Sequence, residues 1–148
     1  MSISASIDLK LYSKIINFTT IELINILISN GWNILDYCSK TYLPIGDTGE
    51  FNWQSSSAIT DNEIIEICQK KFINQEVIGL VLTWLDTNIG GEILFYPDGN
   101  ISMILNLNRI KNQSTDLTDF DWYLSKIIPC LNKHYIEVYS VICEHSYM

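Results

Sequence analysis

The chain has 148 residues, of which 47% are apolar and 18% charged, and its net charge is −8 with a pI near 4.5. This length predicts a single domain spanning residues 1–148, and the apolar fraction excludes a disordered chain. Direct binding of nucleic acid is not expected, because it needs clustered Lys and Arg. Here Arg109 is the sole arginine and the eight lysines are scattered.

Targeting and redox signals predict a cytoplasmic protein without a membrane partner. The start MSISASIDLKLYSK lacks the basic segment and continuous apolar stretch of a secretory signal. The most apolar runs, such as VIGLVLTWL, reach about half of the ~20 residues that a membrane helix needs. The four cysteines form no C-x-x-C pair, and three fall within apolar patterns, which is typical of reduced, buried thiols.

The first two predicted elements are a strand and a helix. Residues 2–11 alternate between apolar and polar side chains, which predicts a strand with one buried face. Thr19 and Glu22 have the spacing of a capping box, and the helix that they open should end at Asn30-Gly31. Its expected core stripe is Ile21, Ile24, Leu27 and Ile28.

A long irregular region and a second helix follow. Residues 32–59 mix short apolar pieces with Gly, Pro and Ser, which predicts brief strands and a long loop. Long loops in compact domains are often functional. Thr60 and Glu63 form a second capping box. The helix behind it should bury Ile64, Ile65, Cys68 and Phe72.

Residues 77–108 predict an antiparallel meander of three strands. VIGLVLTWL is almost continuously apolar, so it should be an interior strand that is covered on both faces. The turns DTNIGG and Pro97-Asp98-Gly99-Asn100 then separate two further strands, EILFY and ISMILNLN.

The last predicted elements are a third helix from about Asp116 to Lys133 and a final strand, HYIEVYSVIC, which could be an edge that pairs with a partner. Pro129 should kink or end the helix near residues 125–128. The fold class is therefore α+β, a mostly antiparallel sheet flanked by about three helices. The expected stripe of the third helix is Leu117, Phe120, Leu124, Ile127, Ile128 and Leu131.

No motif predicts an enzyme, a cofactor or a metal site. Asp47-Thr48-Gly49 matches the core of the aspartic-protease signature, but Gly46 and Glu50 depart from the residues that should flank it. Cys130 and His134 could join Cys143 and His145 around zinc, yet a long strand would separate the two pairs. Nucleophile-elbow, phosphate-loop, zinc-protease and dinucleotide motifs are all lacking. An enzyme using scattered carboxylates stays as a further alternative, which predicts a concave pocket with a strongly perturbed acid.

Two segments combine acids with aromatic residues and are the candidate partner-binding residues. A helical wheel places Trp122 almost opposite the apolar stripe of the third helix, and tryptophan is enriched at binding hot spots. Coverage of Trp122 by a neighbouring loop or by the kinked C-terminal part is the competing interpretation. Two such segments on a small acidic domain predict a basic partner. The first segment contributes Asp47, Glu50, Phe51 and Trp53, and the second contributes Asp116, Asp119, Asp121 and Trp122.

The chain as a whole, and above all the meander VIGLVLTWLDTNIGGEILFYPDGNISMILNLNR with its flanking helices, resembles the immunity proteins of bacterial contact-dependent growth inhibition and other polymorphic toxin systems. The resemblance implies a protein that binds and neutralises the C-terminal domain of a cognate toxin. Many such toxins are basic nucleases, so an acidic inhibitor would cover the active or substrate-binding surface. The alternative function is a small regulatory or scaffold domain that binds a cellular protein and has no toxin partner.

Overall fold

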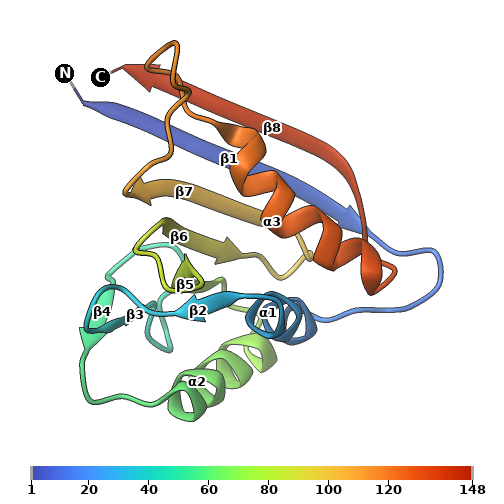
Figure 1. Ribbon diagram of the computed structural model, residues 1–148. Helices are drawn as coiled ribbons and strands as arrows, with labels where there is room; N and C mark the ends of the chain where they lie inside the picture. The colour runs from blue at the N-terminus through green and yellow to red at the C-terminus, as the bar shows by residue number, and fades with distance from the viewer. Residues whose placement is uncertain (1, 148) are drawn as a thin grey trace.

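One twisted antiparallel sheet organises the molecule in the computed structural model, which describes residues 2–147 (Figure 1). Its strands are β1 (Ile3–Tyr12), β2 (Trp32–Ile34), β3 (Lys40–Tyr42), β4 (Gln54–Ser56), β5 (Ile78–Trp84), β6 (Gly90–Phe95), β7 (Ile101–Leu107) and β8 (Glu137–Tyr147). They are ordered β4-β3-β5-β6-β7-β1-β8, and β2 pairs with β5 outside this path.

Three helices complete the described part of the chain: α1 (Thr20–Ser29), α2 (Asp61–Ile73) and α3 (Phe120–Lys133). They gather against one face of the sheet, and α1 lies between the other two (Figure 1). The α+β prediction is confirmed, including the meander, since β5, β6 and β7 are consecutive antiparallel neighbours.

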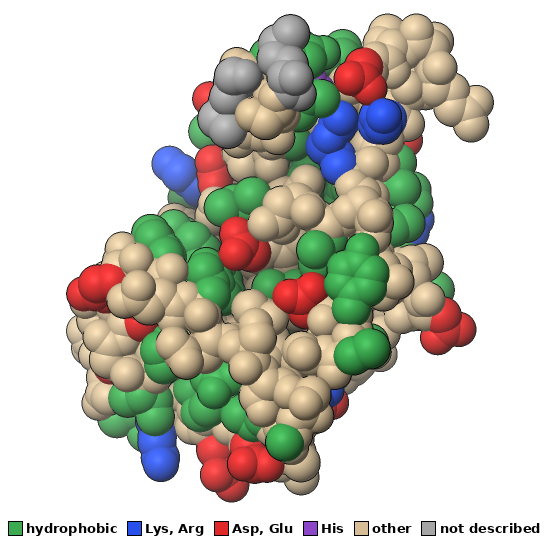
Figure 2. Space-filling model, turned by 90° about the vertical axis from the view of Figure 1, so that its left-hand side faces the viewer, with side chains coloured by type: hydrophobic (Ala, Val, Ile, Leu, Met, Phe, Trp, Pro, Cys, Tyr) green, Lys and Arg blue, Asp and Glu red, His purple; other side chains and the backbone are tan. Residues whose placement is uncertain are grey.

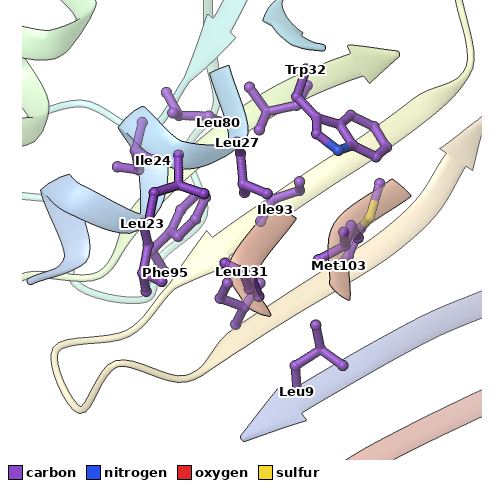
Figure 3. Close-up of a cluster of buried hydrophobic side chains, with 14 of the residues drawn as sticks. Leu9, Leu23, Ile24, Leu27, Trp32, Leu80, Ile93, Phe95, Met103 and Leu131 are labelled. Carbon is purple, nitrogen blue, oxygen red and sulfur yellow. The ribbon is translucent and has the colours of Figure 1, made fainter. Parts of the chain in front are cut away.

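The main hydrophobic core fills the space between helices and sheet. Figure 3 shows Leu23 and Leu27 of α1 directed at Ile93 and Phe95 of β6, with Leu131 of α3 beside them. Each of these side chains is almost completely buried. Burial of one such side chain stabilises the fold by roughly 1.5–3 kcal/mol, so this layer holds the helices on the sheet.

The first and fifth strands follow their predicted patterns for different reasons. In β1, alternate residues are buried because only the helix-facing side is covered. In β5, six successive residues are buried. A second small cluster of Leu43, Val77 and Leu94, with Trp53 and Tyr96 packed against it, accounts for this by covering the opposite face.

The starts of α1 and α2 agree with the sequence, whereas the buried faces of these two helices are shifted. Thr19 caps α1, and Thr60 and Glu63 form a complete capping box at α2. In α1, Leu23 and Ile26 are buried and the predicted Ile21 and Ile28 are half-buried. In α2 the prediction for Phe72 is wrong, because its ring is exposed while its neighbour Lys71 is fully enclosed.

The third helix differs from the prediction at its start and at Pro129. It begins at Phe120 rather than Asp116, because Asp119 accepts the backbone N–H of Trp122 and caps it. Leu117 therefore lies in the preceding loop, exposed. Pro129 does not end the helix, which continues to Lys133. Proline has no backbone N–H, so the carbonyl of Ser125, four residues before Pro129, lacks its helical hydrogen bond. Both residues lie on the exposed side of the helix, where water can bind that carbonyl.

Candidate functional site

The structure keeps the two predicted acidic-aromatic segments apart. Residues 47–53 lie in the connection from β3 to β4, at one end of the strand order. Residues 116–122 lead into α3, and Thr118 contacts His145 of β8 at the other end of the order (Figure 1). The two segments therefore cannot form a single site, and each is a separate surface.

A buried lysine fixes the loop of residues 43–53, called the pinned loop below. The Lys71 ammonium group is fully buried and donates to the backbone oxygens of Pro44, at 2.7 Å, and Asp47, at 2.9 Å. Its third acceptor is Oε1 of Glu76, at 3.1 Å. An ammonium group has three N–H donors, so this cation is completely satisfied.

Glu76 holds the same loop from the carboxylate side. Its Oε1 accepts the backbone N–H of Gly46 at 2.7 Å, and its Oε2 accepts the side-chain amide of Asn74 at 3.3 Å. Burial raises the pKa of Glu76, but the Gly46 N–H and the Lys71 cation outweigh it, so the pKa is lowered. Glu76 thus remains charged, and its contacts with Lys71 and Gly46 tie the loop to the end of α2.

Asp47 is the organiser of the pinned loop and not a surface acid, which corrects its assignment as a partner contact. Its buried carboxylate accepts four successive backbone N–H groups, those of Gly49, Glu50, Phe51 and Asn52, at 2.7–3.1 Å. Burial alone would raise the pKa of Asp47, but these hydrogen bonds lower it to about 2. The lone pairs of this carboxylate are used inside the loop, so it has little capacity left for a partner.

The pinned loop presents an apolar and acidic tip to solvent. Phe51 is 47% exposed and has a φ of 57°, a backbone conformation that is strained for a bulky residue. Glu50 is exposed beside it, and its Oε2 accepts the backbone N–H of Thr48 at 2.7 Å. Ile45 is exposed on the same loop and was missed in the sequence, where a single apolar residue after Pro44 carries no recognisable signal.

Trp53, the fourth predicted residue of this segment, serves the fold more than the surface. It is half-buried and packs against the small cluster of Leu43, Val77 and Leu94. A Cβ at Gly79 would lie 2.8 Å from Cη2 of Trp53 and 2.6 Å from Cδ1 of Leu43. Only glycine at this position of β5 therefore leaves room for the indole ring. The exposed tip is therefore Ile45, Glu50 and Phe51.

The second segment has exposed acids around a half-buried tryptophan. Asp116 lies 3.4 Å from Lys111 and is exposed, and Asp121 is exposed in the first turn of α3. Asp119 is half-buried, with its carboxylate bonded to the Trp122 N–H at the cap. Asp116 and Asp121 remain available to a partner, while Asp119 is committed to the helix.

The helical wheel predicted an exposed Trp122, but its side chain is half-buried. Its ring packs edge-on against buried Tyr123, with the ring centroids 5.0 Å apart, and the Lys126 ammonium lies 4.9 Å from its centroid. The same ammonium lies 5.9 Å from the ring of Trp84, at the end of β5. Trp84 was missed because the sequence contains no pattern that joins residue 84 to residue 122. This cluster explains the position of Trp122 through packing.

A hollow in the surface formed by residues 2–147 lies away from both segments. The hollow of about 600 Å³ beside β8 is lined by Tyr12, Ile128, Tyr135, Val138 and Val141, among others, and includes none of the predicted site residues. Within residues 2–147, no cluster of three or more His, Cys, Asp or Glu could hold a metal ion, and no helix is long and apolar enough to cross a bilayer. In Figure 2 acidic groups are scattered among apolar patches rather than gathered in one place.

Comparison with known proteins adds no relative to this description. No family model matches the chain, and none of the curated proteins or solved structures compared with it is significantly similar.

Proposed function

We propose that this protein is an inhibitor of another protein, an immunity protein that binds and neutralises a cognate toxin domain. The observation that carries the proposal is the pinned loop. A fully satisfied buried cation and a carboxylate with four backbone hydrogen bonds hold a strained, exposed Phe51 beside an exposed Glu50. What distinguishes Phe51 is that its exposed ring stands on a loop that is fixed in advance, and an aromatic anchor on a rigid loop suits a binding hot spot.

Preorganisation is what the pinned loop would contribute to binding. Ordering loops and side chains at an interface costs conformational entropy, which weakens binding. A loop that is already fixed avoids most of this cost, so the burial of Phe51 in a partner pocket would contribute more fully to affinity. Glu50 lies next to Phe51 and would accept hydrogen bonds from a Lys or Arg of the partner.

The net charge of −8 supports a basic partner, such as a nuclease domain. Opposite charges accelerate association, with rates up to ~10⁸–10⁹ M⁻¹s⁻¹ at low salt. The exposed Asp116 and Asp121 would add to this long-range attraction. The inhibitor would cover the active or substrate-binding surface of the toxin, and it would act in the cytoplasm, where the four free cysteines would stay reduced.

The proposal is tested with the C-terminal domain encoded immediately upstream of this protein's gene. Expression of that domain should kill cells, and co-expression of this protein should rescue them and yield a 1:1 complex. The double variant Glu50→Ala/Phe51→Ala should raise the Kd at least ~10-fold, which corresponds to ~1.4 kcal/mol. Isothermal titration calorimetry measures the Kd, and circular dichroism checks the fold.

The matched control is Tyr135→Ala. Tyr135 is also an exposed aromatic residue with positive φ, at 63°, but it lies outside the pinned loop. Its substitution should leave the Kd unchanged. An upstream domain that is harmless, or that kills without rescue or binding, would favour the regulatory domain over the immunity protein. A complex that tolerates the double variant would remove the pinned loop as its anchor.

A further inference from the structure

The last strand is an open edge of the sheet. Among the described strands, β8, with 11 residues, pairs with β1 alone, and the loop before α3 reaches it near its C-terminal end, where the Thr118 N–H donates to Nδ1 of His145 (Figure 1). Proteins usually protect such an edge with lysine, proline or a very short strand, because unpaired backbone groups are a template for another strand. The sequence EVYSVICEHSY contains no Lys, Arg, Pro or Gly.

The centre of β8 is apolar on both faces. Val141 pairs with buried Leu9 of β1 and is 42% exposed, and Cys143 pairs with buried Ile7 and is also exposed. Ile142, between them, points to the opposite face and is 53% exposed. The buried β1 side chains Leu9 and Ile7 therefore have apolar neighbours on β8, and these neighbours are exposed to solvent.

We propose that β8 pairs with β8 of a second copy, antiparallel, around a two-fold axis at Ile142. Side chains directly opposite one another in an antiparallel pair lie on the same face. In this register Ile142 faces Ile142 of the second copy, and Val141 faces Cys143 of the second copy. Apolar groups then meet apolar groups on both faces, and the two sheets become one continuous sheet.

Charge complementarity favours this register. Glu144 of one copy lies opposite Ser140 of the other, and Ser140 pairs with Lys10 of β1 on the same face. The small serine leaves room for Lys10 to approach Glu144 of the second copy, and the symmetry creates this contact twice. Registers centred on Val141 or Cys143 would instead place Glu144 against Val138 or Ile142, so a carboxylate would face an aliphatic side chain.

The whole-molecule charge does not prevent this pairing. Charges that lie farther apart than the Debye length, about 8 Å at physiological ionic strength, are largely screened. The pinned loop remains free in the dimer, because it adjoins β3 and β4 at the other end of the strand order. Dimerisation is therefore a property separate from the proposed inhibition.

Sedimentation equilibrium of the full chain tests the pairing. The wild-type protein should be a dimer, and Ile142→Asp should raise the dimer Kd at least ~100-fold, because two carboxylates would face each other at the axis, each beside Asp8 of its own β1. Ile104→Asp is the matched control: Ile104 is a 38% exposed apolar residue, paired with Ser6 on the same face of the sheet but on the inner strand β7. It should leave the Kd unchanged. A monomeric wild-type protein, or an Ile142→Asp protein that remains dimeric, would overturn the proposal.

Cysteine cross-linking tests the register. In a Cys38→Ser/Cys143→Ser background, Ile142→Cys should form a disulfide-linked dimer under mild oxidation. Directly opposed residues have Cα atoms about 4.5–5.5 Å apart, within disulfide reach. Ser140→Cys in the same background should stay unlinked, because its two copies would be offset by four residues, roughly 13 Å along the strands. Cross-linking at Ser140 but not at Ile142 would contradict the register.

Discussion

The two acidic-aromatic segments have similar compositions and opposite structures. In the pinned loop the organising acid, Asp47, is inside and the ring of Phe51 is outside. At the start of α3 the acids Asp116 and Asp121 are outside, and Trp122 is half-buried against Tyr123 and Lys126. Composition alone thus does not say which member of such a segment is available to a partner.

The difference arises from the backbone donors that each segment leaves unpaired. A loop without regular structure has many free N–H groups, and one carboxylate that collects four of them, as Asp47 does, fixes the loop. A helix start needs a capping acid for its first turn, which Asp119 supplies, and its other acids stay in solvent. Whether an acid is buried or exposed therefore depends on how many unpaired backbone N–H groups lie near it.

The largest expected effect is the loss of the buried cation in Lys71→Met. The variant leaves the Glu76 carboxylate and the oxygens of Pro44 and Asp47 without their shared donor. Removing one member of a buried ion pair typically costs 3–5 kcal/mol, so we expect the free energy of unfolding to fall by about 3–5 kcal/mol. Urea denaturation measures this change. The control is Lys70→Met on the exposed side of the same helix, which should change stability by less than ~0.5 kcal/mol. Equal losses in the two variants would show that the buried contacts do not hold the loop.

Asp47→Asn is expected to have the next largest effect, and its size should depend on pH. The amide keeps one oxygen acceptor but loses the charge, so stability at pH 7 should fall by about 2 kcal/mol. The folded pKa of about 2 lies below the ordinary value of 3.8, so the charge stabilises the fold fully above about pH 4. That contribution is lost as the pH falls from about 4 toward 2. Unfolding curves of both proteins between pH 2 and 7 should therefore converge at the acidic end. A constant difference across this range would mean that the charge of Asp47 does not support the loop.

Much of the fold was predictable because its signals are local. Period-two alternation revealed β1, continuous apolar character revealed β5, and the Thr60–Glu63 box marked the start of α2. Helix α3 was predicted to start too early, since Asp116 and Asp119 are equally plausible caps in the sequence. Helix α3 also continues through Pro129, where Pro129 and Ser125 both lie on the exposed side, a placement that the sequence does not state.

The candidate site was less predictable, because its decisive contacts join distant segments. Lys71 looks like a surface residue beside Lys70, and its acceptors at residues 44 and 47 come from a loop 24–27 positions away. The pairing of Trp84 and Trp122 around Lys126 has no sequence pattern either. Glu50 and Phe51 were predicted from composition and are exposed, whereas Asp47 and Trp53 serve the loop and the core.

The smallest expected changes in stability come from the acids of the second segment, Asp119 and Asp121. Asp119→Ala removes the side chain that caps α3, so the free energy of unfolding should fall by about 1 kcal/mol. Asp119→Ser keeps a capping oxygen and should restore most of the loss, although it removes the charge. Asp121→Ala should cost less than Asp119→Ala, because an acid in the first turn interacts with the helix dipole by about 0.3–1 kcal/mol and accepts no capping bond.

Thermal unfolding at low and high salt separates the two mechanisms: a hydrogen-bonded cap persists in salt, while a dipole interaction is screened. If Asp119→Ser were as unstable as Asp119→Ala and salt removed the difference from wild type, Asp119 would act through its charge, and it would belong with Asp116 and Asp121 as a surface acid.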